Sequence, residues 1–217
     1  ISGDTSYIAS TILDGSHHSD IIYAENFGAT NTNLQQLIGF TITKNGNIWA
    51  GRGIRKEGDG LTVFSNLKMN VNNTQIWGTN IWNQDGPAIF NNIVIDGIIN
   101  GDNIIAINGS DTTIFNNLRF TNNEGYMFFQ HDPHVLFNNC TVGRMVGPNY
   151  EILAQGTAGS SVIVTNSIFL PSFNAAQYTS ITINNSCFSN VFSDDSNINT
   201  FYGSNNIDLA PLFVDTA

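Results

Sequence analysis

Charge is scarce in this sequence. Only 11% of its 217 residues are Asp, Glu, Lys or Arg, less than half of the roughly 25% that is typical of soluble domains. The seven basic residues face seventeen acidic ones, which leaves a net charge of −10. So few Lys and Arg residues exclude the basic surface that binds nucleic acid through its phosphates. We expect no nucleic-acid partner.

Long apolar runs, cysteines and catalytic motifs are equally scarce. No apolar run reaches the length that a membrane-spanning helix needs, so no membrane span is expected. The two cysteines, Cys140 and Cys187, fall in repeat units that are too far apart for a disulfide, which predicts two free thiols. The sequence contains no nucleophile elbow, P-loop, dinucleotide fingerprint or zinc-ligand spacing.

Asparagine supplies much of the polar surface that charged residues would otherwise provide. The chain has 32 Asn, and many of them fall beside apolar residues. Asn and Gly are poor helix formers and good turn formers. The composition therefore favours an all-β fold whose polar surface is largely uncharged.

An internal repeat organises most of the chain. Segments such as "VFSNLKM" from Val63, "IFNNIVI" from Ile89 and "LFNNCTV" from Leu136 place an Asn at one phase of a shared pattern. The aligned residues are Asn66, Asn92, Asn117, Asn139, Asn166 and Asn185, with Gly39 at the same phase in an earlier unit. Their spacing varies between 19 and 27 residues, which suits a solenoid with loops of different length and not a propeller.

Within each unit the apolar pattern has a period of two. Leu67 and Met69 alternate with Lys68, which is typical of a strand with one face inward. The aligned Asn can adopt the left-handed backbone of a sharp turn and can hydrogen-bond along the stack. Two residues earlier, a second column of Phe64, Phe90, Phe115 and Phe137 predicts stacked core rings. We therefore predict one domain, residues 1–217, folded as a right-handed parallel β-helix of about seven or eight coils with an internal asparagine ladder.

A further strand is expected in each coil, at residues 74–80, 102–108, 125–131 and 150–156. Two of these segments are apolar at consecutive positions, which predicts an apolar strip on the outside of the solenoid. A loop, another subunit or a sugar ligand could cover that strip. If it binds a ligand, the candidate contacts are Trp77, Trp82, Phe129 and His131, with Trp49 beside them.

Acidic residues form a second column, six or seven residues before the ladder. Asp59, Asp85, Asp111 and Asp132 would lie near one edge of consecutive coils. They could be simple turn formers, ligands for Ca²⁺, or an acid–base pair for glycoside hydrolysis. In the catalytic alternative, Asp85, Asp111 and Asp132 would act together with Arg119. No other cofactor is expected.

The segments "TILDG" at 11–15, "LIGFTITKNG" at 37–46 and "NNIDLAPLFVD" at 205–215 carry a family resemblance. With the repeat, they resemble the right-handed parallel β-helix proteins of the pectate-lyase-like superfamily, in particular secreted and cell-surface members. That resemblance implies the fold but not one activity, because the superfamily includes lyases, glycosidases, adhesins and filaments. The expected function is a secreted or surface-exposed structural protein that acts through self-association or adhesion. The alternative is a carbohydrate-active enzyme or glycan-binding module with a polysaccharide partner.

Overall fold

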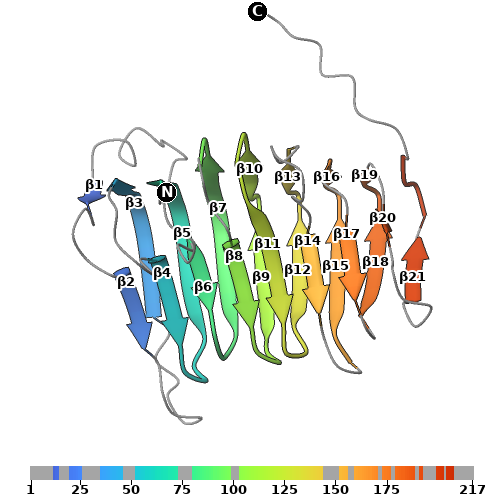
Figure 1. Ribbon diagram of the computed structural model, residues 1–217, viewed down its shortest axis with the longest axis horizontal. Coiled ribbons are helices and arrows are strands. Elements are labelled where there is room, and N and C mark those ends of the chain that lie inside the picture. Colours follow the sequence, from blue (N-terminus) through green and yellow to red (C-terminus); the bar gives the residue numbers. More distant parts are fainter. Residues whose placement is uncertain are drawn as a thin grey trace, which may run out of the picture.

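The computed structural model shows an elongated stack of parallel strands (Figure 1). It describes residues 12–14, 20–25, 35–45, 52–72, 80–98, 103–143, 152–155, 159–170, 173–176, 179–188, 191–192, 199–202 and 204–207. Within these residues there are strands and turns and no helix. Every strand pair in them is parallel, which confirms the predicted all-β solenoid.

One wall of the solenoid is an eight-stranded sheet, to which each pass of the chain adds one strand. Its strands in spatial order are β2 (Asp20–Glu25), β4 (Arg52–Glu57), β6 (Ile81–Asn83), β8 (Asn103–Asn108), β11 (Tyr126–Gln130), β14 (Ile152–Gln155), β17 (Phe173–Ala176) and β20 (Val191–Phe192).

The other two walls belong to a thirteen-stranded sheet that bends at a corner. At one end it begins with the short strand β1 (Ile12–Asp14), and the next three strands are long and run through the corner: β3 (Gln35–Asn45), β5 (Thr62–Asn72) and β7 (Ala88–Asp96). Beyond β7 the sheet divides into one wall of β9 (Thr112–Asn116), β12 (His134–Asn138), β15 (Ser161–Thr165), β18 (Ser180–Asn184) and β21 (Asn199–Tyr202). The other wall continues through β10 (Arg119–Thr121), β13 (Thr141–Val142), β16 (Ile168–Phe169) and β19 (Cys187–Phe188).

Four successive turns therefore have three separate strands each, from β9–β10–β11 to β18–β19–β20. The earlier turns join two of their three walls in one long strand. The prediction of about seven or eight coils thus differs from the structure, in which four turns of the described residues have three separate strands. Repeats of similar sequence differ here in whether the ladder of backbone hydrogen bonds continues through the corner.

The corner itself is formed by the predicted asparagine column. All six of its members have a positive φ, between 49° and 57°, a conformation that Asn tolerates better than most side chains. Asn92 donates its amide to Asn66 Oδ1 and Asn117 donates to Asn92 Oδ1, both at 2.8 Å. The predicted ladder is confirmed, and its Asn92 and Asn117 side chains lie at the exposed outer edge of the corner.

The ladder continues further than the repeat indicated, and a second one runs beside it. Asn205 also has a positive φ, 62°, and donates to Asn185 Oδ1 at 3.0 Å. One residue before the corner, Asn116 donates to Asn91 Oδ1 at 2.9 Å, and this pair is partly buried. Deeper still, Asn83 donates to Thr113 Oγ1 at 2.8 Å, and both residues are fully enclosed. Asn side chains therefore hold successive turns in register from the surface to the core.

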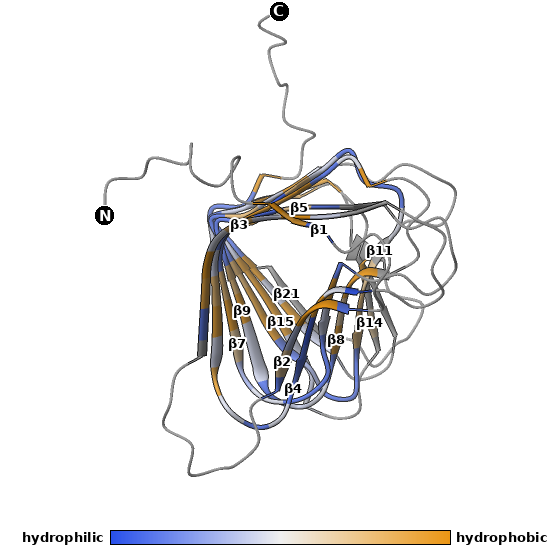
Figure 2. Ribbon diagram, turned by 90° about the vertical axis from the view of Figure 1, so that its left-hand side faces the viewer, coloured by the Kyte–Doolittle hydropathy of each residue, from blue (hydrophilic) through white to orange (hydrophobic). Residues whose placement is uncertain are grey.

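The interior is a continuous apolar column enclosed by the three walls, which Figure 2 shows along the axis of the stack. Phe64, Phe90, Phe115 and Phe137 stack face to face, with ring centroids 4.9, 5.0 and 5.2 Å apart. All four side chains are buried. The predicted aromatic column is confirmed.

The predicted third strand of each coil is confirmed in three of four cases, as β8, β11 and β14. For the fourth, residues 74–79 lie outside the described residues, and β6 begins at Ile81. Both cysteines are free, as predicted, with Cys140 buried in the core and Cys187 half-buried. Burial raises the pKa of the Cys140 thiol to about 11.

Candidate functional site

The four predicted aspartates occupy equivalent turns of the solenoid. Each turn connects a strand of the eight-stranded sheet to the next strand of the larger sheet: Asp59 between β4 and β5, Asp85 between β6 and β7, Asp111 between β8 and β9, and Asp132 between β11 and β12. The first three are exposed, and Asp132 is half-buried. Asp132 Oδ1 accepts a hydrogen bond from Ser160 Oγ at 3.4 Å.

A buried lysine lies beneath the first three of these turns. Lys56 is on β4, paired in register with Asn83 on β6, and Asn83 is paired with Ile107 on β8. These side chains point inward, and Lys56 has no exposed surface. Its ammonium donates to the carbonyl oxygens of Gly58 and Asp85. The repeat pattern does not reveal this site, although Lys56 falls two residues after the inward Ile54 and therefore has the phase of a core position.

Burial and the nearby aspartates shift the pKa of Lys56 in opposite directions. Burial lowers the pKa of Lys56 to about 8, against the attraction of Asp111, Asp85 and Asp59, which favours the charged form. Burial also raises the pKa of Asp85, with repulsion from Asp59, Glu57 and Asp111 adding to the rise and Lys56 opposing it. The three carboxylates thus stabilise a cation that the core alone would disfavour.

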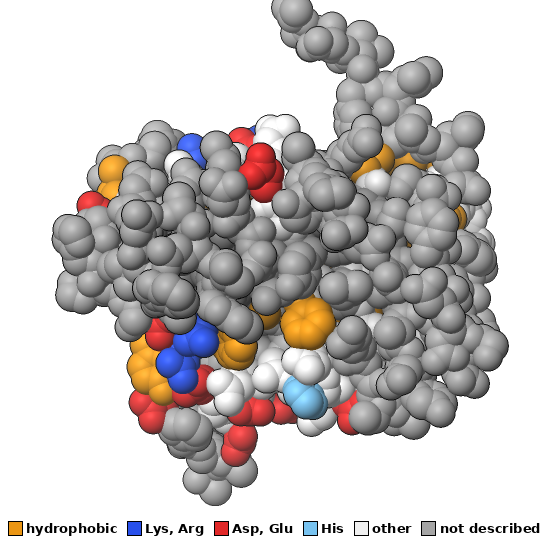
Figure 3. Space-filling view, in the orientation of Figure 1, with side chains coloured by type: hydrophobic (Ala, Val, Ile, Leu, Met, Phe, Trp, Pro, Cys, Tyr) orange, Lys and Arg blue, Asp and Glu red, His pale blue; other side chains and the backbone are white. Residues whose placement is uncertain are grey.

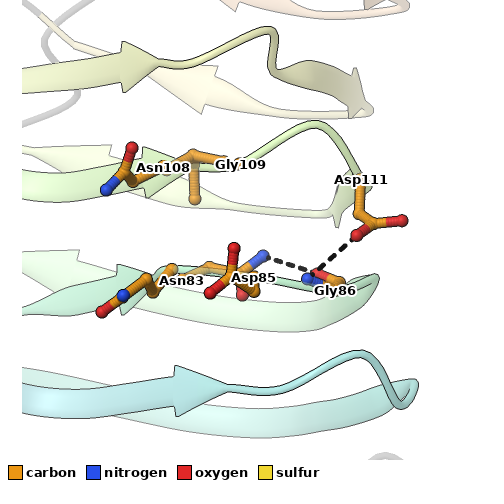
Figure 4. Close-up of a pocket in the computed structure, with 8 residues that line it drawn as sticks. Asn83, Asp85, Gly86, Asn108, Gly109 and Asp111 are labelled. Carbon is orange, nitrogen blue, oxygen red and sulfur yellow. Dashed lines mark hydrogen bonds between the residues drawn. The ribbon is translucent and has the colours of Figure 1, made fainter. Parts of the chain in front are cut away.

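Gly86, in the turn between β6 and β7, lies directly against the Lys56 ammonium. Its backbone N–H donates to Asp111 Oδ2 at 3.1 Å, and its carbonyl oxygen accepts from Asn83 Nδ2 at 3.2 Å (Figure 4). Gly86 has a φ of 75°, and a Cβ built on it would overlap Lys56 Nζ and the carbonyl oxygen of Gly58. Only glycine fits both this backbone conformation and this contact.

The surface above the lysine is a shallow hollow between two turns. Residues 83–86 of one turn and 107–109 with Asp111 of the next line it. The hollow is too narrow to hold a water molecule, so it cannot accept a sugar ring as it stands. Several polar groups here bond one another, as Asn83 and Asp111 do with Gly86, while the side-chain oxygens of Asn83 and Asn108 are buried without a partner among the described residues.

The calcium prediction gains no support from this arrangement. In the part of the chain that the structure describes, no group of three or more His, Cys, Asp or Glu side chains is placed to hold a metal ion. The Lys56 ammonium already supplies a positive charge beneath Asp59, Asp85 and Asp111. Asp132 is bound to Ser160 instead.

The catalytic alternative does not bring its basic member to the aspartates. Arg119 lies on β10, beyond the corner at Asn117, and therefore on a different wall from the turn that carries Asp111. It forms an ion pair with Asp96 at 3.6 Å, and its side chain is 58% exposed. The structure thus separates Arg119 from the column of aspartates.

Two of the predicted ligand contacts, Phe129 and Trp82, lie on opposite faces of the eight-stranded sheet, and a third, His131, lies in a turn. Phe129 is fully buried, 6.0 Å from the ring of Phe137, so the prediction that it touches a ligand is wrong: it has the inward phase of β11. Trp82 points outward from β6 and is partly exposed. His131 is exposed in the turn with Asp132, with a φ of 60°. Trp77 and Trp49 lie outside the described residues.

The outward face of the eight-stranded sheet carries a row of ring and guanidinium side chains. These are Tyr23, Arg55, Trp82 and Phe128, which occupy one register position of the sheet, with Ala106 between Trp82 and Phe128. Figure 3 shows basic side chains toward one end of this face, an apolar patch near its middle and acidic side chains along the lower rim. Part of the predicted apolar strip is enclosed by the chain itself, since Ile104 and Ala106 are buried.

Ion pairs fix the end of this row. Arg55 bonds Glu57, and its guanidinium carbon lies 5.1 Å from the centre of the Tyr23 ring. Burial alone would raise the pKa of Glu57, but hydrogen bonds from Tyr23 and Arg55 outweigh it and lower that pKa. Arg52 lies 4.3 Å above the Trp82 ring and pairs with Asp20 at 3.7 Å. This cluster joins β2, β4 and β6 on the outside of the wall.

Comparison with known proteins identifies no relative: no family model, no curated protein and no solved structure matches this chain. No helix among the described residues has the length and apolarity to cross a membrane. The fold class and the geometry above are therefore the basis for any statement about function.

Proposed function

We propose that this chain is a structural β-solenoid of a secreted or cell-surface protein, and that it works by associating end to end with further copies. The observation that carries the proposal is the open core at the β1–β3 end. Leu13, Ile22, Leu37 and Phe40 pack against the core but are only partly buried, whereas the apolar residues that follow them in the stack, such as Ile54, Phe64 and Leu67, are enclosed.

The backbone at this end is open as well. β1 pairs only with Thr41–Thr43, so within the described residues the first half of β3 has β5 as its single neighbour. Ile38 lies on that half and is 50% exposed, and at the far end of the stack Ile207 is 57% exposed. Unpaired parallel edges can accept a further strand. Because the two ends differ, such contacts are head to tail and extend into a filament.

The surroundings of the aspartate turns are consistent with this structural role. The carboxylates that the repeat brings together surround Lys56, and the hollow beside them does not admit water. A structural role uses the regular stack itself, which the ladders and the aromatic column stabilise.

Sedimentation velocity over a range of protein concentrations, with electron microscopy of the same samples, tests the proposal. We expect species that grow with concentration and appear as linear particles. Ile38→Lys places a charge on the open edge and should shift the population toward monomer. Ile163→Lys is the matched control, because Ile163 is 36% exposed on β15 in the middle of the stack. A monodisperse monomer at every concentration would refute end-to-end association.

A second candidate is glycan binding by the outward row, which the partly exposed rings of Trp82 and Phe128 favour. Aromatic faces stack on sugar rings, and the amide of Gln130 lies two residues beyond Phe128 on β11, beside its register partner Asn108 on β8. A glycan array with the wild type and Trp82→Ala would test it. Equal signals from both proteins would remove this role for Trp82.

A further inference from the structure

Three reactive groups from three successive turns meet at the backbone of Asp85 and Gly86. The amine of Lys56 comes from β4, the carboxamide of Asn83 from β6, and the carboxyl of Asp111 from the turn after β8. Lys56 Nζ bonds the carbonyl oxygen of Asp85, Asn83 Nδ2 bonds that of Gly86, and Asp111 Oδ2 accepts from the Gly86 N–H. All three side chains thus bond the backbone of the adjacent residues Asp85 and Gly86, and Figure 4 shows the bonds of Asn83 and Asp111 to Gly86.

The amine and the amide are also neighbours in the sheet. Lys56 and Asn83 are register partners on adjacent parallel strands, and both side chains point inward. Their exposed fractions are 0% and 2%. Asn83 Oδ1 is buried and accepts no hydrogen bond, and the hollow above it excludes water. At 2% exposure the Asn83 side chain has little contact with bulk water.

The protonation states suit an attack by the amine. Burial lowers the pKa of Lys56 to about 8, so roughly one molecule in ten has a neutral amine at pH 7. An unprotonated amine is a nucleophile, and desolvation of a lysine is one of the ways in which proteins activate it. Asp111 provides a carboxylate that is hydrogen-bonded to the Gly86 N–H, where it can accept a proton and return it.

We propose that Lys56 and Asn83 join in an intramolecular amide cross-link between β4 and β6. The lone pair of Lys56 Nζ attacks Asn83 Cγ, and the new C–N bond replaces the Cγ–Nδ2 bond. The proton lost from Nζ passes through the Asp111 carboxylate to the departing nitrogen, which leaves as ammonia. An amine and a primary amide are converted to a secondary amide and ammonia, and no oxidant, reductant or other reactant is needed.

The physical gain is the removal of a buried charge. An ammonium in the core is costly even with carboxylates nearby, whereas a secondary amide is neutral. The bond would also tie two turns covalently near the open end of the stack. This inference stands on the Lys56–Asn83–Asp111 geometry alone and does not depend on the proposed self-association.

Intact mass spectrometry of the purified chain tests the cross-link. The expected mass is lower than the sequence mass by about 17 Da, the mass of ammonia. Trypsin should then release one branched peptide in which residues 56–68 are joined to residues 69–119, because cleavage after Lys56 is blocked. An unshifted mass, or a loss of about 18 Da from condensation with a carboxyl group, would overturn the assignment.

Matched variants separate this bond from other losses of ammonia, such as succinimide formation at the Asn–Gly pairs elsewhere in the chain. Lys56→Met and Asn83→Leu should both restore the full mass. Asp111→Asn keeps an acceptor for Gly86 N–H but loses the proton carrier, so its mass should also be unshifted. Asp59→Ala, two turns before Asp111, should still lose ammonia. A loss that persists in Lys56→Met contradicts the proposal, and the wild-type branched peptide decides it even where a variant does not fold.

Discussion

A free Lys56 amine should make the stability of the solenoid rise with pH in a defined window. The perturbation is a pH series on Asn83→Leu, a variant that has no amide for the lysine to attack. The pKa of Lys56 is lowered from 10.5 to about 8 in the folded chain by burial. Between these two values the unfolded chain binds more protons than the folded one, so the free energy of unfolding increases as pH rises.

The size of the effect follows from the shift. At about 1.4 kcal/mol per pKa unit, the full rise between pH 8 and pH 10.5 is about 3 kcal/mol. Below pH 8 this contribution is flat and unfavourable to folding, because both states are protonated there and the folded chain encloses the charge. Removing the ammonium by titration relieves that penalty.

Urea denaturation followed by far-ultraviolet circular dichroism measures the free energy at each pH. The double variant Lys56→Met, Asn83→Leu is the control, because tyrosines and the other charged groups still titrate in it. The difference between the two curves should rise by the stated amount. Parallel curves would refute the reasoning that burial dominates the protonation of Lys56. The wild type, if cross-linked, should follow the double variant, because an amide does not titrate in this range.

The remaining predictions concern the core, the corner and the thiol. Phe115→Ala removes the middle ring of the aromatic stack and should cost about 3–5 kcal/mol in urea unfolding, with Phe115→Leu costing less; equal, small losses would contradict tight packing at a ring with 0% exposure. Asn92→Ala should destabilise more than Asn92→Gly, by about 1 kcal/mol, because both lose the ladder bonds but only glycine accepts a φ of 55° without strain; the same unfolding assay compares them. Cys140 should resist iodoacetamide at pH 8 until urea is added, because its pKa is raised to about 11 in the folded chain; mass spectrometry would detect early labelling, which would contradict its burial.

The regular features of the fold were predictable because each is written into a local pattern. An apolar period of two indicated the strands, and the column of Asn66, Asn92 and Asn117 marked the corners. The phase of Phe64 relative to Asn66 placed the aromatic column in the core. Asn205 was missed because the sequence before it departs from the apolar pattern of the other units.

The candidate site was predictable only in part. The repeat placed Asp59, Asp85 and Asp111 in equivalent turns, as the structure shows. It gave no indication that a buried lysine lies beneath them. The sequence did not single out Lys56, because a lysine side chain is ordinarily exposed. Phe129 was assigned to an outer strip because its segment is apolar at consecutive positions, which leaves the inward phase undetermined by sequence.

The sequence by itself determined the solenoid: the residue that turns each corner, the side of each strand that faces inward and the identity of the stacked rings. These are properties of one repeat unit, and stacking multiplies them. Only the tertiary structure decided which side chains of different turns meet. Lys56, Asn83 and Asp111 belong to turns joined by loops of unequal length, so their convergence on Gly86 depends on how the turns are packed and not on any spacing along the chain.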